Sequence, residues 1–388
     1  MRNIREHLTE YYAPKNFNFM YYFGSLALLV LVVQIVSGIF LTMHYKPDAE
    51  LAFASVEHIM RDVNYGWLIR YMHSTGASAF FIVIYLHMFR ALMYGSYKQP
   101  RELVWLVGML IFLVLMAEAF MGYVLPWGQM SYWGAQVIIN LFTPIPYIGP
   151  DLAEWIRGGF SIDDPTLNRL FALHVVALPI VLLALVAVHL IALHEVGSNN
   201  PDGVEIKKNK DETGKPVDGI PFHPYYTVKD IFGAVVFLFV AAVIIFYLPT
   251  AGGYFLEHDN FMESDPLQTP EHIKPVWYFG TFYAILRAVP DKLTGVVLMF
   301  LAIAFLFLLP WLDRSKVKSW RFRPIYKQMV ILFGISFVVL MWLGGQPATA
   351  TYTMFARIFT VIYFAFFIAL PFVSKWEKPK PVPERVTK

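Results

Sequence analysis

Eight long apolar runs dominate this sequence and decide what kind of structure the chain can form. They lie at about residues 23–43, 74–94, 103–125, 174–193, 230–248, 294–312, 326–343 and 353–373. Each has about twenty residues, which is enough for an α-helix to cross ~30 Å of hydrocarbon. The chain is 57% hydrophobic with a mean hydropathy of +0.52, too apolar for a soluble globular protein of 388 residues. We therefore predict an all-α polytopic membrane protein with eight transmembrane helices.

Basic residues are distributed unevenly between the two sides of such a protein. If the N-terminus faces the cytoplasm, 22 of the 31 Lys and Arg residues lie on the cytoplasmic side. The positive-inside rule favours this orientation, which predicts that both termini are cytoplasmic. The polar stretch 1–15, followed by an apolar run long enough to span, predicts no short cleavable signal.

Two of the apolar runs carry a histidine near either end. His73 and His87 are fourteen residues apart, within about 40° of a whole number of helical turns. Both side chains therefore point from one face, about 21 Å apart along the helix axis. His174 and His189 are fifteen residues apart, within about 60° of alignment. Two such helices could hold two flat groups at two depths in a membrane.

Haem iron explains four histidines in two matched pairs better than the alternatives do. A single membrane histidine is more often hydrogen-bonded to a neighbouring helix or lines a polar cavity. Imidazole is a standard axial ligand of haem, and two per iron leave no open position, which suits electron transfer. Zinc would require three or four ligands at one point, whereas these pairs lie about four turns apart. Because the chain has no cysteine, it can hold no iron–sulfur cluster or thioether-linked haem.

Two arginines accompany one histidine pair at regular spacing. Arg70 precedes His73 by three residues, and Arg90 follows His87 by three. Each guanidinium could meet an anionic haem propionate. The alternative is a side chain that extends to the membrane interface, and both interpretations stay open.

Glycines repeat the same interval in two other apolar runs. Gly24 and Gly38 are fourteen residues apart, as are Gly108 and Gly122, so they are expected at the depths of the histidines. A single glycine usually reflects close helix packing in lipid. The repetition favours backbone free of side chains beside a macrocycle. Pro179 lies between two of the histidines and should kink its helix, accommodating the extra residue of spacing.

Three long connections organise the rest of the chain. The proline-rich segment 126–172 is expected on the outer side as short helices along the membrane interface. The polar segment 195–229 separates a four-helix dihaem domain, residues 1–215, from a second four-helix domain, residues 216–388. Segment 249–293 is the other long outer loop. The sequence contains no phosphate-binding loop, nucleophile elbow or nucleic-acid-binding patch.

Several motifs occur in one order over nearly the whole chain. They are RDVNYGWLIRYMHSTGAS, GYVLPWGQMSYWGA, HEVGSNNP, IPFHPYYTVKDI, PVWY and GGQP. With them the chain resembles cytochrome b, the membrane core of the quinol:cytochrome c reductase (cytochrome bc) complex. The resemblance implies two non-covalent b-type haems and a Q cycle. The low-potential outer haem would lie between His73 and His174, and the high-potential inner haem between His87 and His189.

The resemblance also implies two quinone sites. The outer, quinol-oxidising site would use Tyr123, Gly134, Pro275, Val276, Trp277, Tyr278 and Tyr283. The inner, quinone-reducing site would use His194, Ser198, Lys229 and Asp230. The residues support this inner site independently, since His194 follows His189 by five positions and Asp230 opens the fifth apolar run on the same side. A histidine and a carboxylate there could deliver protons to a reduced quinone.

The implied partners are a Rieske-type iron–sulfur protein, a cytochrome c1-type subunit, a second copy of the complex and the lipid bilayer. The fifteen-residue histidine spacing resembles photosynthetic relatives, which divide the protein into two chains, whereas this chain is continuous. That combination suggests a bacterial cytoplasmic membrane and leaves ubiquinol or menaquinol open. A dihaem anchor of a quinone-linked dehydrogenase and a haem-free proton-coupled transporter are the alternatives. The long outer loops argue against the anchor, and an optical spectrum would identify the transporter.

One position departs from the family pattern in a way that affects the chemistry. The PVWY motif has Val276 where relatives often have a glutamate, and an aliphatic side chain cannot accept the proton of quinol. Glu118 is our candidate base, because it lies about 10 Å from the outer end of its helix and on the face of Gly122. The alternative is a glutamate hydrogen-bonded to a neighbouring helix. Tyr278 and a histidine of the iron–sulfur partner are rival acceptors.

Overall fold

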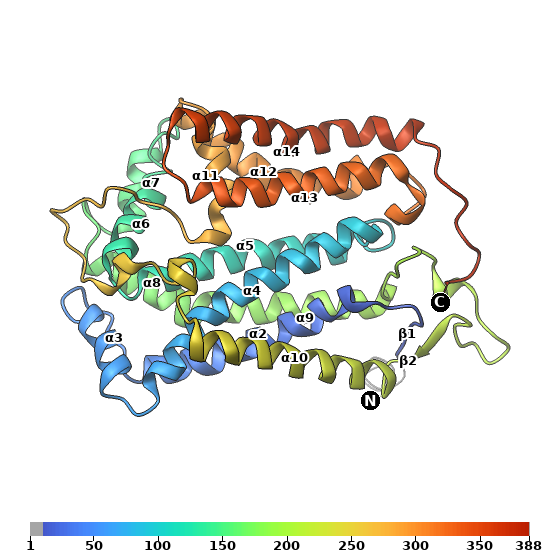
Figure 1. The fold of residues 1–388 in the computed structure, drawn as a ribbon, viewed down its shortest axis with the longest axis horizontal. Coiled ribbons are helices and arrows are strands. Elements are labelled where there is room, and N and C mark those ends of the chain that lie inside the picture. The colour runs from blue at the N-terminus through green and yellow to red at the C-terminus, as the bar shows by residue number, and fades with distance from the viewer. Residues whose placement is uncertain (1–10, 388) are drawn as a thin grey trace.

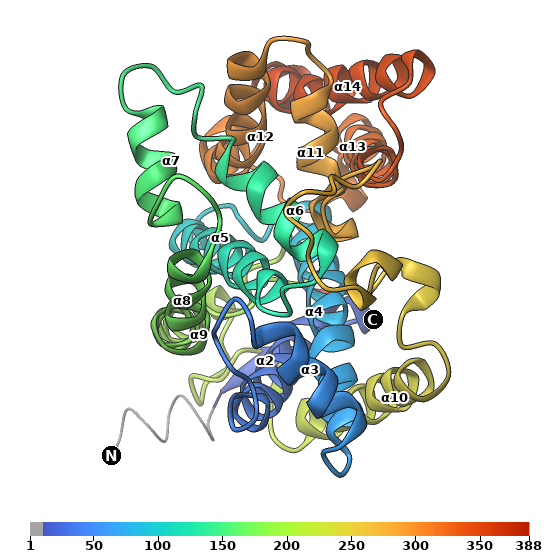
Figure 2. The same ribbon diagram turned by 90° about the vertical axis from the view of Figure 1, so that its left-hand side faces the viewer.

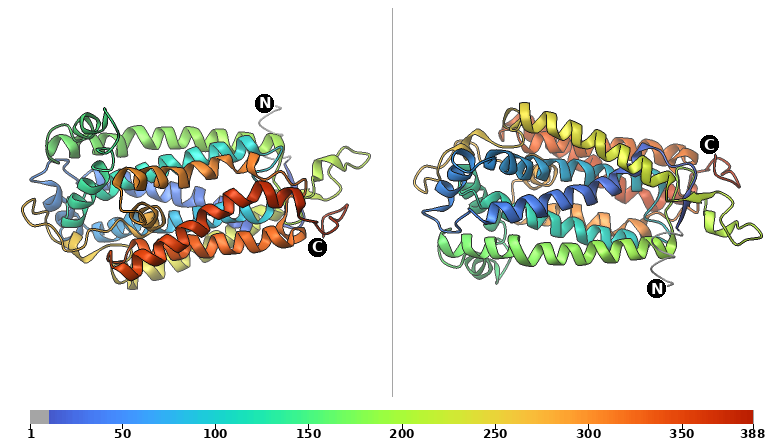
Figure 3. Two further views of the ribbon diagram at one scale, coloured as in Figure 1. Left: turned by 90° about the horizontal axis from the view of Figure 1, so that it is seen from above. Right: turned by 90° about the horizontal axis from the view of Figure 1, so that it is seen from below.

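A computed structural model of the chain describes residues 11–387. Residues 1–10 and 388, which include the predicted cytoplasmic N-terminus, lie outside the described residues. Within residues 11–387, eight helices are long and apolar enough to span a membrane, so the predicted number is confirmed. They run side by side along the long axis of the molecule (Figures 1 and 3). Among the described residues, the one sheet pairs β1 (Tyr12–Pro14) with β2 (Gly219–Pro221), and the all-α class is confirmed.

The helices form two groups around one core. The principal helices are α2 (Tyr22–Thr42), α3 (Ala52–Arg61), α4 (Gly66–Tyr94), α5 (Glu102–Val124), α6 (Gln129–Ile139), α7 (Gly149–Arg157), α8 (Asp164–Ala172), α9 (Leu178–Val196), α10 (Tyr225–Tyr247), α11 (Gly280–Arg287), α12 (Lys292–Leu312), α13 (Pro324–Gly344) and α14 (Ala350–Trp376). In the first group α2 packs against α4, and α5 against α9. In the second, α13 packs against α11 and α14. Helix α10 contacts α2 and α4 of the first group (Figure 2). One cluster of buried apolar side chains joins both groups.

The fourth spanning helix changes its winding around His174. Helix α8 leads into a π-helical turn, Leu173–Ala177, before α9 begins at Leu178. A π turn holds one residue more than an α turn and occurs often at functional sites. The adjustment expected near Pro179 therefore takes the form of this π turn, which takes up the extra residue between His174 and His189.

Short elements gather at one end of the bundle, which we call the loop end. The predicted helices of segment 126–172 are present as α6, α7 and α8, and α3 and α11 lie at the same end (Figure 1). The opposite end holds the β1–β2 sheet and the C-terminus (Figure 1), and we call it the terminal end.

Candidate haem and quinone sites

The four predicted histidines meet in two pairs inside the first group of helices. The ring centres of His73 and His174 lie 6.2 Å apart, with an angle of 85° between the ring planes. Those of His87 and His189 lie 6.4 Å apart, at 60°. One member of each pair comes from α4 and the other from the π turn or α9. The first pair lies toward the loop end and the second toward the terminal end.

The separation of the rings fits one metal ion between the members of each pair. An imidazole nitrogen lies about 2 Å from a bound metal and about 1.1 Å from its own ring centre, so two opposed ligand rings have centres about 6 Å apart. Both observed separations agree with this value. Two such imidazoles are the axial ligand set of an electron-transferring haem.

Each predicted glycine lies against one of the histidine rings. A β-carbon at Gly24 would be 3.3 Å from Cε1 of His87, and one at Gly38 would be 3.2 Å from Cε1 of His73. At Gly108 the contact would be 3.2 Å from Cε1 of His189. The contact at Gly122 would be the closest, 2.5 Å from Cε1 of His174. The glycines therefore make room for the histidine rings, a more direct role than the expected contact with a macrocycle.

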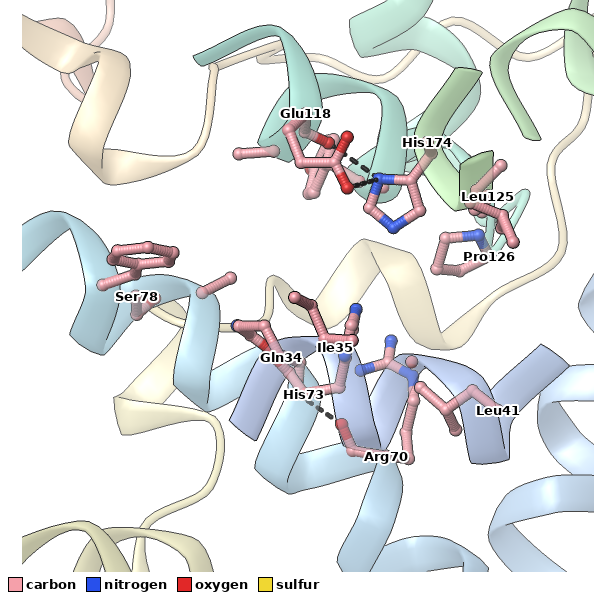
Figure 4. A pocket seen from close by; sticks show the side chains of 18 of the residues that line it. Gln34, Ile35, Leu41, Arg70, His73, Ser78, Glu118, Leu125, Pro126 and His174 are labelled. Atoms are coloured by element: carbon pink, nitrogen blue, oxygen red, sulfur yellow. Dashed lines mark hydrogen bonds and ion pairs between the residues drawn. The ribbon is translucent and has the colours of Figure 1, made fainter. Parts of the chain in front are cut away.

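Hydrogen bonds orient the rings of the loop-end pair. Nδ1 of His73 lies 3.0 Å from the Ser37 hydroxyl. Nδ1 of His174 lies 2.9 Å from the carbonyl oxygen and 3.0 Å from the carboxylate of Glu118 (Figure 4). When Nδ1 is engaged in this way, Nε2 is left to face the neighbouring ring, as it faces the metal in histidines that bind one. The sequence did not predict the role of Ser37, although its position beside Gly38 is a usable signal.

Both arginines lie where an anionic group would satisfy them. Arg70 lines the cavity between His73 and His174 (Figure 4). At the terminal end, a guanidinium nitrogen of Arg90 lies 3.1 Å from Nδ1 of His87. The buried Nε of Arg90 has no hydrogen-bond partner among residues 11–387. An unpartnered buried donor of this kind is costly, and a propionate would supply its acceptor.

The space between His73 and His174 extends toward the predicted quinol site. A cavity of about 270 Å³ is lined by both histidines, Glu118 and Arg70, and Figure 4 shows them around it. The same cavity reaches Tyr123, Val276 and Tyr278. The loop-end histidine pair and the predicted quinol site therefore share one apolar space.

A second, small cavity collects most of the predicted quinol-site residues. It has a volume of about 30 Å³, and its lining includes Tyr123, Gly134, Pro275, Val276 and Tyr283. The remaining two lie beside it in other roles. Trp277 donates from its indole to the Ser78 hydroxyl at 3.0 Å. The ring of Tyr278 stacks on that of Phe81 with centres 4.0 Å apart.

A carboxylate that the sequence analysis missed touches this site. The hydroxyl of Tyr123 donates to Oε2 of Glu257 at 3.1 Å, and Glu257 is buried in the loop before α11. The two residues are 134 positions apart, so no local pattern connects them. In the sequence, Glu257 is distinguished only as an acidic residue within the expected outer loop.

At the terminal end, Tyr11 joins two of the predicted inner-site residues. Its ring stacks on that of His194 with centres 4.8 Å apart, and its hydroxyl lies 2.8 Å from that of Ser198. Lys229 and Asp230 lie near the start of α10, with the Lys229 ammonium 5.1 Å from the centre of the Tyr226 ring. Tyr11 carries no local sequence signal for this role, because its contacts lie more than 180 residues away in the chain.

Comparison with known proteins agrees with this geometry over nearly the whole chain. Residues 8–197 match the family model described as cytochrome b/b6/petB, and residues 263–364 match cytochrome b(C-terminal)/b6/petD. The chain is 62% identical to a cytochrome b of Allochromatium vinosum, covering 99% of this chain and 94% of the relative. It is 54% identical to a cytochrome b of Rickettsia bellii, covering 98% and 93% respectively.

A solved structure is similar as well. A chain of a hyperthermophilic respiratory complex III superposes with a TM-score of 0.89 at 41% identity, covering 97% of each chain. The predicted motifs, the two facing histidine pairs and these matches lead to one conclusion: this chain belongs to the cytochrome b family.

Proposed function

We propose that this chain is the catalytic membrane subunit of a bacterial quinol:cytochrome c oxidoreductase. The observation that carries the proposal is the pair of facing histidine couples at two depths, each ring set against a glycine. Membership of the cytochrome b family supports it. The domain division at residue 215, the cytoplasmic membrane and the cytoplasmic termini are parts of the same proposal.

The histidines would hold two b-type haems, one toward each side of the membrane. His73 and His174 would bind the outer haem, and His87 and His189 the inner one. These haems would carry single electrons between the two quinone sites. Arg70 and Arg90 would neutralise propionates. Ser37 and Glu118 would fix the orientation of the outer ligands, since groups that hold a ligand's second nitrogen tune metal sites.

Quinol would be oxidised at the loop end, which is the outer side in this proposal. The side chains that line this small cavity, those of Tyr123, Gly134, Pro275, Val276 and Tyr283, present an apolar surface and would contact a quinone ring once the cavity of about 30 Å³ widened. Each quinol would release two electrons and two protons there. One electron would leave to a Rieske-type iron–sulfur protein and then a cytochrome c1-type subunit, and the protons would leave outside.

Quinone would be reduced at the terminal end, on the cytoplasmic side. His194 and Asp230 would supply the protons, while Ser198 and Lys229 would hold the quinone's polar groups. Because protons would be taken up inside and released outside, turnover would charge the membrane. The complex would act as a homodimer, with ubiquinol or menaquinol as substrate.

The test is to purify the native complex and measure quinol-dependent reduction of cytochrome c together with a redox-resolved optical spectrum. We expect two distinct low-spin b-haem signals per chain and reduction of cytochrome c. Two haems without reduction of cytochrome c would point to a dehydrogenase anchor. A chain without haem would contradict the proposal outright.

A further inference from the structure

We propose that Glu257 accepts a proton of quinol at the outer site, through the hydroxyl of Tyr123. This inference rests on the proposed function and names the acceptor that Val276 cannot provide. Glu257 acts through Tyr123 and is therefore a positioning residue for the Tyr123 hydroxyl. Its carboxylate also receives the proton of that hydroxyl.

Tyr123 occupies the position that such a transfer requires. Its side chain lines both the 270 Å³ cavity and the smaller cavity beside Gly134 and Pro275. Its hydroxyl donates to Oε2 of Glu257 at 3.1 Å. This distance lies within the range over which a general base takes a proton. A quinol bound beside Tyr123, in a widened form of the small cavity, could therefore reach the carboxylate through one hydroxyl group.

The carboxylate is held in place from the neighbouring segments. Glu257 is only 5% exposed, and the side-chain amide of Asn260 lies 3.5 Å from the same oxygen. The carbonyl oxygen of that amide accepts from the backbone N–H of Ser131 in α6 at 2.8 Å. Asn260 thus links the loop that carries Glu257 to α6, the helix beside the quinol cavity. This link holds the carboxylate of Glu257 in place.

The residue after Glu257 lies at the surface. His258 is exposed at the loop end, whereas Glu257 faces Tyr123. Glu257 is therefore placed next to the surface of the loop end, where its proton would leave. This is the side on which the proposed function releases protons.

The charges around Glu257 suit a group that binds and releases a proton. Burial raises the pKa of Glu257 above its ordinary value, and Asp259 adds to this effect. The hydrogen bond from Tyr123 and the positive charge of Lys274 lower it. The hydroxyl of Tyr278 is the other titratable group facing this carboxylate. A raised pKa brings a carboxyl group closer to the working pH, which favours proton transfer.

Glu118 lines the larger cavity but contacts a histidine. One of its oxygens lies 3.0 Å from Nδ1 of His174, where it orients a proposed ligand. The side chain of Val276 is buried and carries no acceptor atom. By contrast, the carboxylate of Glu257 contacts the hydroxyl of Tyr123 at the quinol cavity.

The proton step balances within the proposed reaction. The O–H bond of quinol breaks and its proton joins the Tyr123 oxygen, while the proton of Tyr123 moves to Oε2 of Glu257. Tyr123 ends neutral, and Glu257 ends protonated. One electron and the proton of the second quinol hydroxyl would leave to the iron–sulfur partner, whose histidine would accept that proton, and the other electron would leave to the outer b-type haem. Glu257 then releases its proton to the outer side.

The experiment compares variants of the purified complex by the rate of quinol oxidation between pH 5 and 9, with haem content measured on each sample. Glu257→Gln should lower the rate by roughly tenfold or more and remove the acid limb of the pH profile. The limb arises because Glu257 accepts a proton only above its pKa. In a Tyr123→Phe background, Glu257→Gln should cause no further loss of rate. In a Glu257→Gln background, Val276→Glu should restore part of the rate. Glu271→Gln, an exposed acid in the same outer loop, is the matched control and should leave the profile unchanged.

An assembled Glu257→Gln complex with normal haems, rate and pH dependence would overturn the inference. So would loss of the acid limb in Glu118→Gln alone. If Glu257→Gln does not assemble, Glu257→Asp decides, because a displaced acid limb supports the inference and an undisplaced limb overturns it. A wild-type complex that does not oxidise quinol would instead overturn the proposed function, so the two failures are distinguishable.

Discussion

The two ends of the helical bundle differ in the groups that contact their carboxylates. At the terminal end, buried carboxylates are paired with cations. Asp313 contacts Lys98 at 2.8 Å and Arg323 at 2.6 Å, and Glu205 contacts Arg101 at 2.6 Å. At the loop end, the carboxylates of Glu118 and Glu257 contact an imidazole and a tyrosine hydroxyl, respectively.

This contrast separates structural charges from chemical ones. Burial alone would raise the pKa of Asp313, but the charges of Lys98 and Arg323 outweigh burial and lower it. Such a carboxylate stays ionised and fastens segments together. A buried carboxylate without a close cation can change its protonation state near the working pH, which is useful in catalysis. The loop end also has the large cavity, so the space and the titratable groups occur together.

The largest expected effect is loss of one haem from one end only. His87→Ala or His189→Leu should abolish the inner b-haem signal and leave the outer one, because each haem loses one of two axial ligands. His73→Ala or His174→Leu should do the reverse. The measurement is a redox-resolved optical spectrum with haem stoichiometry. His58→Ala, at an exposed position of α3, is the control that should retain both haems. A His87→Ala chain with two full haems would disprove the pairing.

The next effect concerns chemistry at the terminal end. Asp230→Asn and His194→Leu should each slow reoxidation of the inner haem by quinone by roughly tenfold or more, because proton delivery is lost. Initial reduction through the outer site should be unaffected. Stopped-flow traces that show unchanged reoxidation in both variants would move quinone reduction away from these residues.

The same substitution at the two ends should have unequal effects. A β-carbon at Gly122 would lie 2.5 Å from the His174 ring, whereas one at Gly24 would lie 3.3 Å from the His87 ring. We therefore expect Gly122→Ala to lose at least about half of the outer haem, since a contact that short forces the backbone or the ring to move. Gly24→Ala should keep most of the inner haem. Equal haem loss in the two variants would show that a β-carbon is tolerated equally at Gly122 and Gly24.

The smallest expected effect tests the paired charges through acid stability. Burial would raise the pKa of Glu205, but Arg101 and Lys318 lower it to about 2 from 4.5. A lowered pKa stabilises the folded state above pH 4.5, and this stabilisation, about 3 kcal/mol at most, is lost as the pH falls toward 2. Glu205→Gln should therefore lower the melting temperature at pH 7 by a few degrees and flatten its decline in acid. Differential scanning calorimetry from pH 7 to 3 would measure this, and parallel wild-type and variant curves would contradict it.

The features that repeat within one helix follow from the amino-acid sequence alone. Eight apolar runs of spanning length, the interval between His73 and His87, and the matching interval between Gly24 and Gly38 follow from helical geometry alone. Their depths could therefore be predicted before any packing was known. The resemblance of the motifs to cytochrome b added the residues of the two quinone sites.

Contacts between groups far apart in the chain depend on tertiary packing. The bonds of Tyr123 to Glu257 and of Tyr11 to Ser198 join residues 134 and 187 positions apart. The π turn at Leu173–Ala177 aligns His174 with His73, although periodicity places it about 60° from His189. Such contacts depend on how helices pack against one another, because helical periodicity specifies a face and a depth but not the partner that covers it.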